Sequence, residues 1–230
     1  MVNDIVLYQE RVVDDRNRLA KKSVDIEPII AKKNYYDTAD IKYFTSGDIK
    51  KLIDGASNSF NKMLFVLLYE TGARVSEARN IKFNDIDPAT LKIRVITLKQ
   101  RNRNRIYRVL KISDKLMSLI LQRRLKYNFA DTDFILSKKP AKPQVTQQGI
   151  NFIIKKEVSL LLDKSCIDKA HSHTFRHSRA VHLLDAGMNI MLLKNFLGHS
   201  NISNTLIYLK YSNKDLCDAI DKANNKKEFL

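Results

Sequence analysis

The chain has 230 residues, of which 44% are hydrophobic, so it can form one large domain or two small ones with a buried core. Its 41 Lys and Arg residues exceed its 25 Asp and Glu residues, which gives a formal net charge of +16. Such an excess repels itself in a folded protein and favours a polyanionic partner, either nucleic acid or an acidic membrane surface. No run approaches the ~20 apolar residues that span a bilayer, and the N-terminus lacks the apolar core of a secretion signal. We therefore expect a cytoplasmic protein that binds nucleic acid and no membrane.

Metal-binding and nucleotide-binding motifs are not evident in the sequence. The two cysteines, Cys166 and Cys217, are widely spaced and fit no metal-ligand pattern, so we interpret both as reduced thiols. We find no internal repeat, no phosphate-binding Gly-rich loop and no cluster of carboxylates.

The first half of the chain predicts three helices and a hairpin. Residues 1–44 are charge-rich with weak periodicity and are interpreted as an N-terminal arm or linker. Cap residues at 45–48 predict a helix through residue 53, and the apolar run 60–72 predicts a buried helix closed by its glycine. We expect a short helix from residue 73 and a turn at 84–88. The β-branched segments 91–99 and 105–112 flank a polar tip and predict a β-hairpin.

The second half is mostly helical in pattern. A short strand is expected at 134–137, followed by a Pro-bearing loop. The remaining segments predict helices that begin at Ser113–Asp114, cover 146–162, 174–186 and 190–197, begin again at a Ser203 cap, and end in an amphipathic tail at 213–224. The predicted fold class is therefore mainly α with one small antiparallel β-sheet, an α+β arrangement.

The stretch HSHTFRHSRA, residues 171–180, contains three of the five histidines. His173 and Arg176 lie three residues apart, so both project from one face near a helix start. Three interpretations compete: a metal site, a basic DNA-contacting helix, or a clamp for one phosphate. The arginines at 176 and 179 would repel a cation, which argues against the metal.

Two further segments carry candidate chemistry. In TGARVSEARNI, Arg74 lies between two helices, where its planar guanidinium can be held rigidly and directed at an oxyanion, and Glu77 can orient it. In LGHSNISNTLIYLKYS, His199 follows a glycine and Tyr208 lies nine residues further on. A tyrosine hydroxyl, with a pKa of ~10, needs neighbouring cations to act as a nucleophile.

Together these segments resemble the catalytic domain of the tyrosine recombinases, the family of phage-integrase and Xer-like site-specific recombinases. TGARVSEA resembles the first arginine box, HTFRHSRAVHLLDAG the His-x-x-Arg box, and LGHSNISNTLIY the block that ends in the nucleophilic tyrosine. With a hairpin lysine, the four motifs occur in the family's order between Thr45 and Asn213. The resemblance implies a catalytic domain over residues 45–212 and a tail helix over 213–230.

The resemblance also implies a role for each site residue. Arg74 and Arg176 bracket the scissile phosphate and stabilise its transition state, with Glu77 supporting Arg74. His173 bonds the phosphate and can accept the tyrosine proton, and His199 donates another hydrogen bond.

The nucleophile implied by the resemblance is Tyr208, which would form a 3′-phosphotyrosyl link and free a 5′-hydroxyl. The family's spacing after the Leu-Gly-His block favours Tyr208 over Tyr211, which we expect to pack. The broken bond's energy stays in the covalent link, so the chemistry requires no cofactor, metal or ATP.

Lys99 matches the lysine that protonates the leaving 5′-oxygen from the hairpin. The hairpin turn here is longer and richer in arginine than the family pattern, so Arg101 or Arg103 could take that place. Otherwise we expect Arg101, Arg103, Arg105 and Arg179 to contact the DNA backbone.

The expected partners are a double-stranded DNA recombination site and other copies of the chain. Four-strand exchange implies a homo-tetramer on synapsed DNA, with a monomer or dimer when free. Leu216, Ala219 and Ile220 share one face of the tail helix, which packs either on a neighbouring subunit or within its own chain. We expect the 44 residues before the match to be too few for the helical core-binding domain of most members, so the chain resembles either a short member that lacks this domain or an isolated catalytic fragment.

Two other functions fit parts of the sequence. A type IB topoisomerase would share the chemistry but relax supercoils without choosing a site. A non-catalytic helix-turn-helix regulator fits residues 180–200, with Gly187 in the turn. The regulator leaves Arg74, His199 and Tyr208 without a role.

Overall fold

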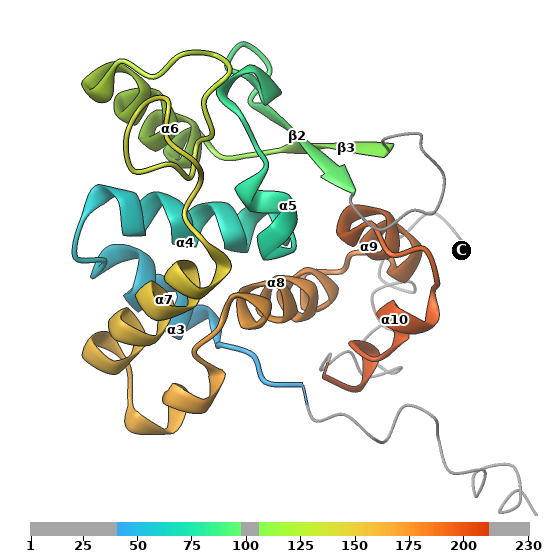
Figure 1. The fold of residues 1–230 in the computed structure, drawn as a ribbon. Coiled ribbons are helices and arrows are strands. Elements are labelled where there is room, and N and C mark those ends of the chain that lie inside the picture. Colours follow the sequence, from blue (N-terminus) through green and yellow to red (C-terminus); the bar gives the residue numbers. More distant parts are fainter. Residues whose placement is uncertain (1–40, 98–105, 212–230) are drawn as a thin grey trace, which may run out of the picture. The chain divides into compact units, whose positions relative to one another are not determined.

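The structure is a computed structural model that describes residues 41–97 and 106–211 (Figure 1). Over these residues it is mainly helical with one three-stranded antiparallel sheet, so the predicted fold class is confirmed. The described helices are α3 (Ser46–Asp54), α4 (Ser59–Thr71), α5 (Val75–Arg79), α6 (Asp114–Tyr127), α7 (Gln147–Leu161), α8 (Ser172–Asp185), α9 (Ile190–Leu197) and α10 (Ser203–Leu206). The 3₁₀ helices are η1 (Phe83–Asp85), η2 (Lys164–Lys169) and η3 (Leu209–Tyr211), and the strands are β1 (Ile86–Asp87), β2 (Lys92–Thr97) and β3 (Ile106–Lys111).

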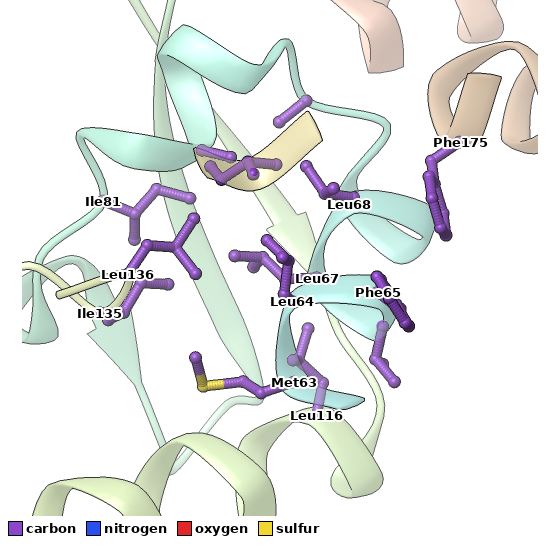
Figure 2. Packing of buried hydrophobic residues seen from close by; sticks show 14 of the residues in the cluster. Met63, Leu64, Phe65, Leu67, Leu68, Ile81, Leu116, Ile135, Leu136 and Phe175 are labelled. Carbon is purple, nitrogen blue, oxygen red and sulfur yellow. The ribbon is translucent and has the colours of Figure 1, made fainter. Parts of the chain in front are cut away.

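Helix α4 is buried on all sides, as its apolar sequence predicts. Every residue from Met63 to Leu68 is buried in the larger hydrophobic core, and α4 packs against α3, α5, α6 and α8. Figure 2 shows Phe65 of α4 beside Phe175 of α8, and the two rings stack with centroids 5.5 Å apart. The helix ends at Gly72, whose φ of 53° lies in the left-handed region that favours glycine. This central helix therefore fixes where the Arg74 segment begins.

Strands β2 and β3 form the predicted hairpin. They pair antiparallel, with Val95 opposite Arg108 and Arg94 opposite Val109. Side chains alternate between the two faces: Val95 is fully buried, whereas Val109 is exposed. Arg108 therefore lies on the inward face of the hairpin. The connecting residues 98–105 lie outside the described part of the chain.

A second, smaller hydrophobic core joins the last helices of the described chain. Its buried members come from the segment before α3, from α8 and α9, and from the α10 region: Ile41, Ala180, Val181, Leu184, Leu193, Leu197 and Tyr208. Tyr208 is 1% exposed. The candidate nucleophile is thus also a core residue in this structure.

Three local predictions were wrong. Residues 134–137 form no strand, because no described strand pairs alongside them and the segment makes only isolated bridges, such as Lys82 with Phe134. The expected turn at 84–88 contains β1, which pairs with β2. Ser203 is the first residue of α10 and not its cap; its backbone N–H donates to Asn201 Oδ1.

Of the three predicted parts of the chain, the arm, the catalytic domain and the tail, the structure describes mainly the catalytic domain. The tail and nearly all of the arm lie outside the described residues, as does Cys217. Ile41 and Phe44, at the end of the predicted arm, are buried against the helical core. Among the described residues, no helix combines the length and apolar character needed to cross a membrane.

We expect Phe175→Ala to destabilise the fold by about 3–5 kcal/mol, since it removes a fully buried ring that packs on both Phe65 and Phe44. The measurement is the free energy of unfolding from urea denaturation. The control is Leu125→Ala, whose side chain is 82% exposed and should change stability by less than about 0.5 kcal/mol. Equal losses for the two variants would contradict the assigned core.

Candidate active site

Arg74 is held at the start of α5 by Glu77. The Arg74 backbone N–H donates to Glu77 Oε2 (2.9 Å) and its Nη1 donates to Glu77 Oε1 (3.0 Å). The Glu77 side chain is only 1% exposed, whereas that of Arg74 is 21% exposed. The buried carboxylate of Glu77 therefore orients the Arg74 guanidinium, and part of the Arg74 side chain faces solvent. The sequence predicted that Glu77 can orient Arg74.

Arg108 completes this ion-pair network and was missed as a site residue. Its Nη2 donates to Glu77 Oε2 (2.7 Å), and its Nη1 donates to Thr97 Oγ1 (3.2 Å). The available sequence signal was strand alternation, because Arg108 and buried Leu110 share the inward face of β3. A charged side chain at an inward strand position requires a buried partner.

Glu77 is a carboxylate shared between two guanidiniums. Burial alone would raise the pKa of the Glu77 carboxyl, but the hydrogen bond and charge of Arg108, followed by those of Arg74, lower it below its ordinary value. Glu77 is therefore ionised at neutral pH. Its negative charge offsets one of the two positive charges of Arg74 and Arg108.

Arg176 is buried and anchored by backbone carbonyls. Its side chain comes from α8 and is 3% exposed; Nη1 donates to the carbonyl of Gly72 (2.6 Å) and Nη2 to that of Leu197 (2.8 Å). Burial, then the charge of Arg74, lowers the pKa of Arg176 to about 10. The guanidinium thus remains charged at neutral pH and joins the ends of α4 and α9, which carry the first arginine box and the His199 segment.

His199 follows the left-handed Gly198 that ends α9. Its Nδ1 lies 2.9 Å from Thr205 Oγ1 of α10. Burial, followed by the charges of Arg176 and Arg74, lowers the pKa of His199 to about 3. The ring is therefore neutral at physiological pH, and with Nδ1 engaged by Thr205 it can present Nε2 to a ligand.

Tyr208 points into this group of side chains and not to solvent. Its hydroxyl lies 2.9 Å from His177 Nδ1. Burial raises the pKa of the Tyr208 phenol, while the charges of Arg176 and Arg74 oppose that shift. Burial, then the charges of His173 and Arg176, lowers the pKa of His177 to about 4. The phenol and the imidazole therefore meet as neutral partners.

His173 is exposed near the start of α8 and lies close to His177, with ring centroids 6.3 Å apart. The bond of His177 to Tyr208 is a contact that the sequence did not reveal. Tyr211 lies elsewhere: its hydroxyl accepts a bond from the Ile41 N–H (2.7 Å), and its ring packs edge-on against Tyr43.

Arg179 lies against the ring of Tyr69, 5.1 Å from its centroid, and is half-buried. Its role in DNA contact stays a prediction. The remaining predicted hairpin residues, Lys99, Arg101, Arg103 and Arg105, lie outside the described residues, so their roles also stay predictions.

Five distant segments of the chain therefore contribute to one electrostatic neighbourhood. Figure 1 shows the end of β2 and helix α9 close to α5 and α8. The charges of Arg74, Arg108 and Arg176 all act on His199, and those of Arg74 and Arg176 act on Tyr208. The group combines fixed cations, neutral imidazoles and a phenol, which suits nucleophilic attack on an anionic ester. Within the described ranges, no group of three or more His, Cys, Asp or Glu side chains could hold a metal ion.

A family model of the phage integrase family matches residues 42–214. Tyrosine recombinase XerA of Pyrococcus horikoshii is 30% identical over 184 residues, which cover 79% of this chain and 61% of that protein. The chain therefore belongs to the phage integrase family. It spans about three fifths of the length of this relative.

Solved structures confirm the fold. The Tn1549 transposon integrase in complex with transposon right end DNA has a TM-score of 0.63 at 20% identity, over 83% of this chain and 67% of that one. The XerH site-specific recombinase bound to the palindromic difH substrate has a TM-score of 0.61 at 18% identity, over 81% of this chain and 53% of that one. The described domain has the tyrosine recombinase catalytic-domain fold.

We expect acid to destabilise the domain through its two neutral site histidines. In the unfolded chain a histidine titrates near its ordinary pKa of ~6.5, whereas burial lowers the pKa to about 4 for His177 and about 3 for His199. Between these values the unfolded chain binds more protons, so the stability contributed by neutral histidine is complete above pH ~6.5 and is lost as the pH falls toward 4.

The measurement is the free energy of unfolding from urea denaturation between pH 8 and 4.5. His177→Asn combined with His199→Asn removes two groups that take up protons only on unfolding, so its stability should fall less steeply below pH 6.5 than that of the natural chain. Parallel curves for the two proteins would show that these rings are not held neutral.

Proposed function

We propose that this chain is a site-specific DNA recombinase that breaks and rejoins strands through a 3′-phosphotyrosyl intermediate. The observation that carries the proposal is that Arg74, Arg176, His199 and Tyr208 come from separate segments and lie close enough for the charges of both arginines to act on His199 and on Tyr208. Family membership supports site-specific recombination as the overall activity.

The proposed reaction is an in-line displacement at one DNA phosphorus. Tyr208 Oη forms a bond to phosphorus as the bond to the 5′-oxygen breaks, so one ester replaces another and no external energy is needed. The phenol loses its proton to a neighbouring base, for which His173 is our candidate. The departing 5′-oxygen gains a proton, for which Lys99 is our candidate.

The charges of the site favour the transition state over the bound substrate. Arg74, Arg108 and Arg176 supply three positive charges and Glu77 one negative charge, so this group of four carries a net charge of about +2. A phosphodiester carries one negative charge, and the five-coordinate transition state gains more. This net positive charge therefore stabilises the transition state more than the ground state, with Arg74 and Arg176 as the guanidiniums that contact the phosphate.

The nucleophile must move before it reacts. Tyr208 is 1% exposed and its hydroxyl is engaged by His177, so a DNA phosphate has no access to it in this arrangement. We propose that DNA binding shifts the α10 segment and releases the phenol toward the clamp. Because strand exchange needs four such sites, we propose a homo-tetramer on synapsed DNA, with a monomer or dimer when free.

A pool of nicked duplexes tests the nucleophile without knowledge of the target sequence. Each duplex carries a randomised segment and a nick just downstream, so that the short 5′-hydroxyl strand diffuses away after cleavage. We expect the natural chain to form an adduct that survives denaturation and can be sequenced, and Tyr208→Phe to form none.

The matched control is Tyr211→Phe, which removes a hydroxyl three residues away and should keep the adduct. An adduct that persists in Tyr208→Phe but is lost in Tyr211→Phe would overturn the choice of nucleophile. Relaxation of supercoiled plasmid without any two-site recombination would instead favour a topoisomerase. No adduct, together with sequence-specific DNA binding, would favour a non-catalytic regulator.

A further inference from the structure

Arg108 lies where the separate parts of the candidate site meet. Its Nη2 donates to Glu77 of α5 and its Nη1 to Thr97, the last residue of β2. Gly198, at the end of α9, is packed so closely that an added Cβ would lie 2.7 Å from Arg108 Nη1 and 3.3 Å from Thr97 Oγ1. One guanidinium thus touches the arginine box, the hairpin base and the segment that carries His199.

The contact with Glu77 makes Arg108 the second holder of the carboxylate that orients Arg74. The Arg108 bond to Glu77 is 2.7 Å, shorter than the 3.0 Å bond from Arg74 Nη1, and the Arg108 side chain is 9% exposed against 21% for Arg74. A charge-assisted bond of this kind is strong because little water competes for it. Without Arg108, only the two bonds to Arg74 itself would hold the Glu77 carboxylate.

The contact with Thr97 ties the same guanidinium to the hairpin. Thr97 lies two residues before Lys99, our candidate donor to the leaving oxygen. Its backbone pairs with Ile106 across the hairpin, so its side-chain bond to Arg108 adds a cross-strand link close to the tip. The position from which the tip segment departs is therefore set by Arg108.

We propose that Arg108 is a positioning residue of the recombination reaction: through Glu77 it fixes the phosphate-binding Arg74, and through Thr97 it fixes the base of the hairpin that delivers the leaving-group proton. This inference rests on the proposed function. Arg108 itself does not contact the DNA phosphate in this proposal. Its loss would affect phosphate binding by Arg74 through Glu77, and proton delivery from the hairpin through Thr97.

Arg108→Met keeps an unbranched chain and removes both bonds. The matched control is Arg94→Met, on the neighbouring strand of the same hairpin, whose 48%-exposed side chain pairs with Asp85 on the other face. We expect adduct formation to slow about 10- to 100-fold in Arg108→Met, the range seen when residues that orient a reacting group are lost. DNA affinity should change less than about threefold in Arg108→Met, and Arg94→Met should leave the adduct rate unchanged.

Two modified substrates separate positioning from a merely structural effect. A methylphosphonate at the scissile position has no negative oxygen to neutralise, so it depends less on Arg74. A 5′-bridging phosphorothiolate leaves as a thiolate, whose parent thiol has a pKa of ~8.5, so it depends less on a proton donor. We expect each substrate to reduce the deficit of Arg108→Met relative to the natural chain.

Thr97→Val isolates the second link, because valine keeps the shape and removes only the oxygen. We expect the phosphorothiolate to restore Thr97→Val to the natural rate and the methylphosphonate to leave its deficit unchanged. If Arg108→Met fails to fold, as judged by its thermal transition, Arg108→Lys and Thr97→Val are tested in its place with the methylphosphonate and the phosphorothiolate.

The outcomes separate this inference from the proposed function. A natural chain that forms no adduct would refute the recombinase. A natural chain that forms the adduct, together with an Arg108→Met that reacts equally fast or whose deficit neither substrate reduces, would refute the positioning role alone. Rescue by at least one substrate supports the role and shows through which neighbour it acts.

Discussion

The shared carboxylate of Glu77 is the interaction on which the candidate site depends. Arg74 and Arg108 come from different parts of the chain, and their like charges repel each other unless an anion lies between them. Glu77 supplies that anion at 1% exposure, where water screens little. A neutral side chain there would leave two guanidiniums close together with no compensating charge, and losing one partner of a buried pair typically costs about 3–5 kcal/mol. The charges that we propose act on DNA therefore also hold the site together.

Arg176 is held by backbone carbonyls and not by a carboxylate, so its charge is not paired in the way that of Arg74 is. Carbonyl oxygens of Gly72 and Leu197 fix its guanidinium at two helix ends, so its positive charge is not cancelled by a carboxylate. The last carbonyls of a helix lack partners within the helix, and an arginine satisfies them. Left-handed glycines close both helices, which brings the two carbonyls to one guanidinium. Burial and two fixed bonds give rigidity, and the positive charge without a carboxylate partner suits the phosphate contact that we propose for Arg176.

Local rules explain why much of the fold could be predicted from the sequence. Side-chain caps at Thr45, Ser113 and Thr146 begin helices where the sequence places them, because each oxygen meets an N–H only a few residues away. The strand predicted at 134–137 was wrong because strand formation depends on a distant partner. The composition of a segment does not show whether another strand lies alongside it. The arginine and histidine boxes were recognised as motifs, and that resemblance is the source of the joint role that we propose for them.

The parts of the site that could not be predicted depend on contacts between distant segments. Arg176 and Gly72 are 104 positions apart, and Arg108 and Glu77 are 31 apart. Strand alternation shows that Arg108 points inward. Only the packing of α5 against β2 shows that Glu77 is its partner. The His177–Tyr208 contact is likewise invisible in sequence, since it requires α8 and the α10 region to share a core.

Two histidine contacts distinguish the proposed phosphate-binding residues from the proposed nucleophile. His199 and His177 are both kept neutral by burial beside cations, yet they engage different partners: Thr205 in one case, the Tyr208 hydroxyl in the other. Protonating either ring would add positive charge next to Arg176, so the field that prepares the site for an anion also keeps both imidazoles uncharged. A bound phosphate reverses this field locally. We propose that its negative charge makes protonation of a nearby imidazole less costly, and so favours loss of the phenol proton to His173 after the α10 segment has moved.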